Sequence, residues 1–185
     1  MKSYKNGARA QANGRAPFLF EDSDAISPEE EKKRAFSKVL RLVKVRDRSV
    51  SEVRKRLLRD GFSETATEDA VSRCIQLRFL DDARFAEVFV RSRLRAGKGL
   101  SGIVRELRSH GINPNELLPG FPDAYLEGAP NQEDAAYALL CRKPPHSKNQ
   151  KQAAYAKLVR AGYSMALAQE VAKRWYSEQV GVSEK

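Results

Sequence analysis

The sequence is poor in the residues that build disulfide frameworks, zinc sites and histidine-based active sites. It has two cysteines and two histidines among 185 residues. Cys74 and Cys141 lack the CxxC spacing of a zinc or redox motif, and we expect both to be buried free thiols on apolar helix faces. His110 stands beside Gly111 at a predicted helix end, and His146 lies in a loop of prolines and lysines. Because neither histidine has a motif partner, we predict no metal centre and no histidine-dependent catalysis.

Long apolar runs and nucleotide-binding motifs are also missing. The longest apolar run, residues 135–141, is far shorter than the roughly 20 residues that span a bilayer, and the N-terminus lacks the apolar centre of a secretion signal. The phosphate-binding patterns GxxxxGKS and GxxxxGKT and the nucleophile pattern GxSxG do not occur. We therefore predict a cytoplasmic protein that is not an enzyme and that needs no membrane, metal or cofactor.

Positive charge, in contrast, is in clear excess. The chain has 34 lysines and arginines against 24 aspartates and glutamates, which gives a formal net charge of +10. Such an excess favours acidic partners such as nucleic acid and carries no information about the fold. Residues 1–26 are polar and basic without helical periodicity, so we predict a disordered basic N-terminal tail. Its apolar residues 18–20 could dock on a partner, although packing on the first helix is the simpler interpretation.

Capping signals and apolar spacing predict three helices after this tail. Ser27 and Ser49 each stand three residues before a glutamate, which is the pattern of a capping box at a helix start. A third helix is predicted after Ser63, and the second is expected to end at Gly61. The predicted core-facing positions are Phe36, Val39, Leu40, Val43, Val50, Val53, Leu57, Ala70, Val71, Cys74 and Ile75.

Residues 80–112 form the most informative stretch. Asp81 precedes a predicted amphipathic helix and is expected to cap it, while Asp82 in the first turn complements the helix dipole. This helix is expected to end at Gly97, and a second helix is expected to end at Gly111. The two acids are therefore predicted to be structural rather than catalytic. The predicted apolar faces of the two helices contain Phe85, Val88, Phe89, Ile103, Val104 and Leu107.

A repeat of about 50 residues runs through the chain. Gly61, Gly111 and Gly162 lie 50 and 51 residues apart, and a leucine stands four residues before each of them. Each glycine closes a short basic helix that follows a longer apolar one. We therefore predict an all-α fold of three tandem three-helix repeats that form an elongated, curved body.

The second repeat is expected to differ from the other two in its third helix. Prolines and a glycine within residues 119–122 interrupt its third helix, which we expect to be short or broken. In the last helix we interpret Trp175 as a core anchor rather than a base-stacking platform. The residues expected on the buried face of that helix are Met165, Ala168, Ala172 and Trp175. The expected bounds of the repeats are residues 27–79, 80–127 and 128–185.

Basic side chains recur on the predicted outer faces of the middle helices and on the helix that follows Asp81. We interpret them as one positive stripe along a groove, able to bind a polyanion or an acidic protein surface, although a run of charges is more often a solvated face. No base-reading motif is present, so sequence-specific recognition of DNA is not expected. The predicted partner-binding or DNA-binding residues are Arg54, Lys55, Arg56, Arg59, Arg91, Arg93, Arg95, Lys98, Arg105, Arg108, Lys151, Lys157 and Arg160.

A set of residues between positions 48 and 112 carries a family resemblance. These residues are Arg48-Ser49, Glu52, Leu57, Gly61-Phe62, Leu80-Asp81-Asp82, Phe85-Ala86, Arg91, Arg93, Gly97, Gly99, Ile103, Leu107, Gly111 and Ile112. With them the chain resembles the RecX family of recombinase regulators, over residues 35–118 well and over 131–177 more loosely. The LDDxxFA segment is quite specific to that family. The motif residues for which we expect a structural role are Leu80, Asp81, Asp82, Phe85, Ala86, Gly97, Leu107 and Gly111.

The resemblance implies tandem three-helix repeats and a function without catalysis. It implies a protein that binds the RecA recombinase filament and damps strand exchange, ATP hydrolysis and coprotease activity, and so modulates recombinational DNA repair and the SOS response. We expect a monomer whose partners are the RecA filament and single- and double-stranded DNA without sequence specificity. The alternative is a sequence-independent DNA-binding protein that affects recombination only by competing for DNA.

Overall fold

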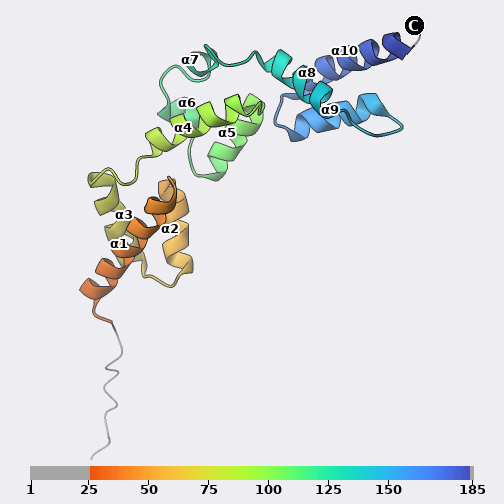
Figure 1. The fold of residues 1–185 in the computed structure, drawn as a ribbon. Helices are drawn as coiled ribbons and strands as arrows, with labels where there is room; N and C mark the ends of the chain where they lie inside the picture. The colour runs from red at the N-terminus through yellow and green to blue at the C-terminus, as the bar shows by residue number, and fades with distance from the viewer. Residues whose placement is uncertain (1–25, 184–185) are drawn as a thin grey trace, which may run out of the picture.

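The computed structural model describes residues 26–183, and side chains are described through residue 179. This part of the chain consists of helices and connecting loops (Figure 1). The predicted basic tail and its apolar residues 18–20 lie outside the described residues. The helices are α1 (Pro28–Val45), α2 (Val50–Arg59), α3 (Glu64–Gln76), α4 (Asp82–Arg95), α5 (Leu100–Ser109), α6 (Pro114–Leu117), α7 (Asp123–Leu126), α8 (Gln132–Arg142), α9 (Gln150–Arg160) and α10 (Met165–Ser183).

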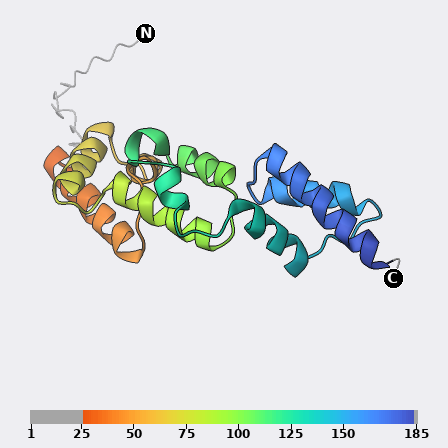
Figure 2. The same cartoon turned by 90° about the horizontal axis from the view of Figure 1, so that it is seen from above.

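The helices form three successive groups, each with its own hydrophobic core. The first module contains α1–α3, the second α4–α7 and the third α8–α10, and every extensive helix–helix contact lies within one module. The modules follow one another along an elongated body, and the first turns away from the line of the other two (Figures 1 and 2). The all-α fold of tandem three-helix repeats in an elongated, curved body is thus confirmed.

Serine caps start all three helices of the first module. The hydroxyls of Ser27, Ser49 and Ser63 accept hydrogen bonds from backbone N–H groups three residues on, which satisfies donors that a helix start otherwise leaves free. The glutamate half of the predicted capping box at Ser49 is different, because the Glu52 carboxylate accepts from Arg46 and Arg48 instead. The core beneath these helices contains Ala35, Val39, Val53, Leu57, Ala66, Ala70, Val71, Cys74 and Leu80.

The second module begins at the predicted cap. The Asp81 carboxylate accepts from the N–H of Arg84 at 3.0 Å, and the helix that it caps buries Ala86, Val90 and Leu94. These residues follow an i, i+4, i+8 spacing and so form one buried face of the helix. Val88, two positions after Ala86, lies on the opposite face. The prediction for Val88 is therefore wrong, since this side chain is 53% exposed. Its neighbour Phe89 packs at the edge of the core.

Three other predictions of buried side chains are also wrong. Cys141 is exposed, because α8 buries Ala136 and Leu140 and the next residue points away from that stripe. Ile75 near the end of α3 is 46% exposed and Met165 at the start of α10 is 70% exposed. The predictions for Cys74 and Trp175 are confirmed, because both are buried. Burial raises the pKa of the Cys74 thiol to about 11.

The predicted break in the third helix of the second module is confirmed. In its place stand α6 and α7, each four residues long. α7 and the segment between the two helices cover the second core with Leu118, Phe121, Tyr125 and Leu126. Leu80 packs in the first core rather than the second, so we propose that the first module extends through Leu80 instead of ending at residue 79.

Candidate partner-binding surface

The middle helices α2, α5 and α9 share one internal register. Leu57, Leu107 and Leu158 are fully buried, and the glycine four residues after each has a positive φ, as in Gly111 at 78°. Successive residues of an α-helix are about 100° apart, so the positions two before and two after the leucine lie on the opposite side of the helix. We call these two places the outward positions of each middle helix.

The predicted basic residues occupy the outward positions unevenly. Two residues before the leucine stand Lys55, Arg105 and Ala156, and two residues after it stand Arg59, Ser109 and Arg160. Neither outward position is therefore basic in all three modules. Each module nevertheless contributes at least one cation to the outward side. We define the outward row as Lys55, Arg59, Arg105 and Arg160, all of which are exposed.

Lys157 lies elsewhere on its helix than the outward row. It stands one residue before Leu158 and is half-buried, and burial lowers the pKa of its ammonium group. The neighbouring charges of Lys143, Arg142 and Arg160 lower this pKa further. Lys157 therefore faces other cations of the third module and is a weaker candidate than Arg160 for contact with a partner.

Some predicted binding residues are already engaged within the protein. Arg54, Arg56, Arg91 and Arg93 form ion pairs with Glu68, Asp60, Glu87 and Glu106, respectively. Arg91 also lies over the ring of Tyr125 and Arg93 over that of Phe89. For some predicted binding residues, the side chain forms no hydrogen bond or ion pair with another residue of the described range 26–183. These are Lys55, Arg59, Arg95, Lys98, Arg105, Arg108, Lys151, Lys157 and Arg160.

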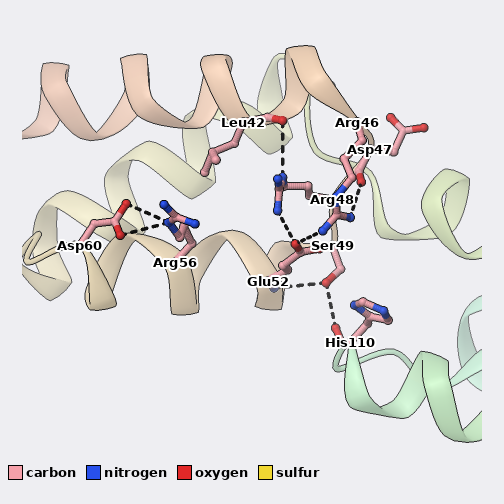
Figure 3. Close-up of polar contacts among 9 residues, drawn as sticks. All are labelled: Leu42, Arg46, Asp47, Arg48, Ser49, Glu52, Arg56, Asp60 and His110. Carbon is pink, nitrogen blue, oxygen red and sulfur yellow. Dashed lines mark hydrogen bonds and ion pairs between the residues drawn. The ribbon is translucent and has the colours of Figure 1, made fainter.

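The first and second modules meet where α2 begins and α5 ends (Figure 3). The buried Ser49 hydroxyl donates to the carbonyl oxygen of His110 at 3.0 Å, and the N–H of Val50 donates to Asp82 Oδ1 at 2.8 Å. The same hydroxyl caps α2, so one side chain serves both a helix start and a contact between modules. We call this contact the first junction, and its two hydrogen bonds both use side-chain atoms.

The second junction repeats this arrangement fifty residues later with backbone atoms. Gly99 corresponds to Ser49, and its N–H donates to the carbonyl of Ala161 at 3.1 Å. The N–H of Gly102 donates to the carbonyl of Gly162 at 2.8 Å. A Cβ added to Gly99 would lie 2.2 Å from the carbonyl carbon of Gly162, and one added to Gly102 would lie 2.6 Å from its Cα. Only glycines permit this approach.

Two side chains complete the second junction. Gln132 corresponds to Asp82, and its Oε1 accepts from the N–H of Leu100 at 2.9 Å. The buried Tyr163 donates its hydroxyl to the carbonyl of Gly97 at 2.8 Å. Backbone contact and these bonds together make the second junction tighter than the first. The sequence interpretation missed both junctions, although the 50-residue period places Asp82 and Gln132 at equivalent positions.

Asp82 gives the first junction a predicted pH dependence. Burial raises the pKa of its carboxyl group above the ordinary value of 3.8, and the nearby Asp81 charge adds to this, against the opposing effects of the Val50 N–H and Arg54. A raised pKa in the folded state stabilises the protein most below the unfolded pKa, and this stabilisation is lost as the pH rises through the folded pKa. The ionised Asp82 therefore costs stability at neutral pH.

We expect Asp82→Asn to raise the melting temperature at pH 7, because asparagine keeps an acceptor for Val50 and removes the charge. Gln132 already performs the equivalent contact as a neutral amide. The difference in melting temperature between the variant and the parent protein should shrink as the pH falls below about 4. Thermal unfolding followed by circular dichroism between pH 3.5 and 7.5 measures this, and a lower melting temperature for the variant at pH 7 would contradict it.

Two family models match the chain. The RecX first three-helix domain matches residues 35–74, and the RecX second three-helix domain matches residues 81–116. Regulatory protein RecX of Cronobacter sakazakii (strain ATCC BAA-894) is 30% identical over 142 residues, which cover 71% of this chain and 86% of that protein. The chain belongs to the RecX family. Regulatory protein RecX of Mycobacterium sp. (strain JLS) is also 30% identical, over 81% of this chain and 85% of its own length.

Solved structures agree on the fold. A crystal structure of regulatory protein RecX has a TM-score of 0.61 at 20% identity and covers 78% of this chain and 73% of its own. The crystal structure of RecX from Lactobacillus salivarius has a TM-score of 0.59 at 19% identity and covers 80% of this chain and 97% of its own. Within residues 26–183, none of the helices combines the length and the apolar character needed to cross a membrane.

The LDDxxFA segment of this RecX chain links two modules. Leu80 is buried in the first core, Asp81 caps α4, and Asp82 accepts from the start of α2 in the first module. Phe85 and Ala86 then enter the second core. The segment thus connects two cores and two helix starts within seven residues, which is a physical reason for acids at both positions.

Proposed function

We propose that this RecX-family protein binds RecA and RecA–DNA filaments and inhibits their recombinase, ATPase and coprotease activities. It would thereby modulate recombinational DNA repair and the SOS response in the cytoplasm. The observation that carries this proposal is the 30% identity over 86% of a curated regulatory protein RecX. The regulatory names of the relatives favour action by binding rather than by catalysis.

The shape and charge of the molecule support binding to a long partner. The three modules follow one another along an elongated body (Figure 2), and each contributes at least one exposed cation to the outward row. A filament of protein on DNA offers acidic side chains and phosphates over a comparable stretch, so several weak contacts can act together. Each module has its own core, which is consistent with a chain that works as a monomer.

The alternative function is inhibition by competition for DNA. The net charge of +10 and the unpaired cations favour some affinity for single- and double-stranded DNA, which we propose to be independent of sequence. In this alternative the protein would need to coat the DNA before RecA activity fell. In the favoured function it acts on assembled filaments.

A titration of preformed RecA–DNA filaments distinguishes the two functions. We expect ATP hydrolysis to fall when the RecX-family protein is present at far less than one molecule per RecA, because each bound molecule affects a filament rather than a single DNA site. Added free DNA should raise the required concentration only slightly. Inhibition that begins only near full coverage of the DNA, and that free DNA reverses in proportion, would establish competition instead.

A further inference from the structure

The first junction contains a basic pocket whose walls come from two modules. Its volume is about 280 Å³, near the lower end of the range for small-ligand sites. The first module supplies Arg48 before α2 and residues along α2 as far as Arg59, and the second supplies Ser109 and His110 at the end of α5. The lining residues are Arg48, Ser51, Glu52, Lys55, Arg56, Arg59, Ser109 and His110.

Positive charge prevails in this pocket. Four of its lining residues are cations and one is a carboxylate. The carboxylate of Glu52 is paired with Arg46 and Arg48, so it does not pair with Lys55 or Arg59. Arg56 pairs with Asp60 at 3.0 Å, whereas Lys55 and Arg59 make no ion pair within the described residues. Two charged donors are therefore available to an anion.

The remaining walls offer polar groups that are held in place by their neighbours. The side chain of Arg48 is 16% exposed and is held by Glu52 and by the carbonyl of Leu42 at 3.4 Å (Figure 3). The ring of His110 is held edge-on by Phe85 and Phe89, with centroids 5.4 and 5.7 Å away. The Ser51 hydroxyl forms no hydrogen bond within residues 26–183 and can donate to an incoming oxygen atom.

We propose that this pocket binds a backbone phosphate of a nucleic-acid strand and that the bound phosphate ties the first module to the second. The proposal rests on the proposed function and names a contact within its binding surface. A phosphodiester accepts hydrogen bonds on two oxygens, which suits Lys55, Arg59 and the Ser51 hydroxyl from the first module. From the second module the ring N–H of His110 can donate, whereas the Ser109 hydroxyl already donates to the carbonyl of Glu106. The ligand touches both modules, so strand binding fixes the angle between them.

The surroundings of the pocket favour a polyanion over a single anion. Arg105 shares a helix face with Ser109 at the i, i+4 spacing, and Arg108 lies beside it, both without an ion pair in the described part of the chain. Cations thus continue from the pocket along α5. A strand with a phosphate at every nucleotide can use the pocket and then this row, whereas one inorganic phosphate can use only the pocket.

The two histidines allow a direct test on the full-length chain. In proton NMR, His110 reports on the pocket and His146 on a distant loop. We expect a single-stranded thymidine oligonucleotide to shift the His110 resonances, and an oligonucleotide with uncharged methylphosphonate linkages to leave them in place. Unmoved His110 resonances with the charged oligonucleotide would overturn the proposal. Equal shifts with inorganic phosphate at the same phosphate concentration would overturn the assignment to a strand.

A pair of matched variants tests the named donors. Lys55→Gln with Arg59→Gln should weaken oligonucleotide binding about tenfold and flatten the slope of log affinity against log salt by about 0.7 per lost phosphate contact. Arg41→Gln with Lys44→Gln removes the same two charges from exposed positions of α1 outside the pocket and should change affinity less than twofold. Equal losses in both variants would show that only net charge matters.

These measurements contain no RecA, so they separate the two proposals. A pocket that binds no strand in a protein that still inhibits filaments would overturn this inference alone. A pocket that binds the strand in a protein without effect on filaments would overturn the proposed function alone.

Discussion

Charge reversal at one outward position in each module is expected to abolish filament inhibition without unfolding the protein. The variant carries Lys55→Glu, Arg105→Glu and Arg160→Glu, all at exposed sites. Exposed substitutions away from packed features change stability by about 0.5 kcal/mol or less each. The partner surface, in contrast, would meet three repelling charges where it had three attracting ones. Filament ATP hydrolysis and circular dichroism of the same preparation measure the two effects.

The control for this experiment reverses Lys33, Arg41 and Lys44 on α1. These residues are exposed and lie outside the middle helices, and their reversal also lowers the formal net charge from +10 by six. We expect this variant to inhibit filaments nearly as well as the parent. If both variants lose inhibition equally, net charge and not the outward row governs binding, and the assignment of that row fails.

The second large effect is expected at the second junction. Gly102→Ala should loosen the third module, because the new Cβ would lie 2.6 Å from Gly162 Cα. Overpacking of this kind costs about 1–3 kcal/mol, and loss of the bond between Gly102 and Gly162 adds about 1 kcal/mol. The higher helix propensity of alanine offsets about 1 kcal/mol of this loss. The net effect of Gly102→Ala should therefore be a lower free energy of unfolding.

Trp175 makes this effect measurable, since it is the one tryptophan of the chain and lies in the third core. Its fluorescence should report a lower melting temperature in the Gly102→Ala protein, and X-ray scattering should report a changed maximum dimension. Ser101→Ala, an exposed neighbour in the same helix turn, is the control and should leave both unchanged. A Gly102→Ala protein that melts at a higher temperature would show that helix propensity alone acts there.

Local signals in the sequence predicted the helix ends well. Ser27, Ser49 and Asp81 cap helices through their own side chains, and the glycine at 111 has the positive φ that the end of α5 requires. Such features depend on a few neighbouring residues, so a short stretch of sequence contains all the information they need. The repeat of these signals also gave the number of modules.

Contacts across modules could not be predicted in the same way. The bond from Ser49 to His110 joins residues 61 positions apart, and no local periodicity encodes such a pair. The predicted face of a helix was also wrong by about one residue in α4, which is why Val88 was placed in the core. A shift of one residue turns a side chain by about 100°, enough to exchange a buried position for an exposed one.

The most direct test of the binding surface is a photo-crosslink to RecA–DNA filaments. A photoreactive benzoylphenylalanine at Ser109, an uncharged outward position of the second module, should form a covalent adduct with RecA. The same residue at Ser37, which is exposed on α1 outside the outward row, should form little or none. Adducts with RecA from position 37 and none from position 109, in proteins that both inhibit the filament, would contradict the claim that the middle helices face the filament.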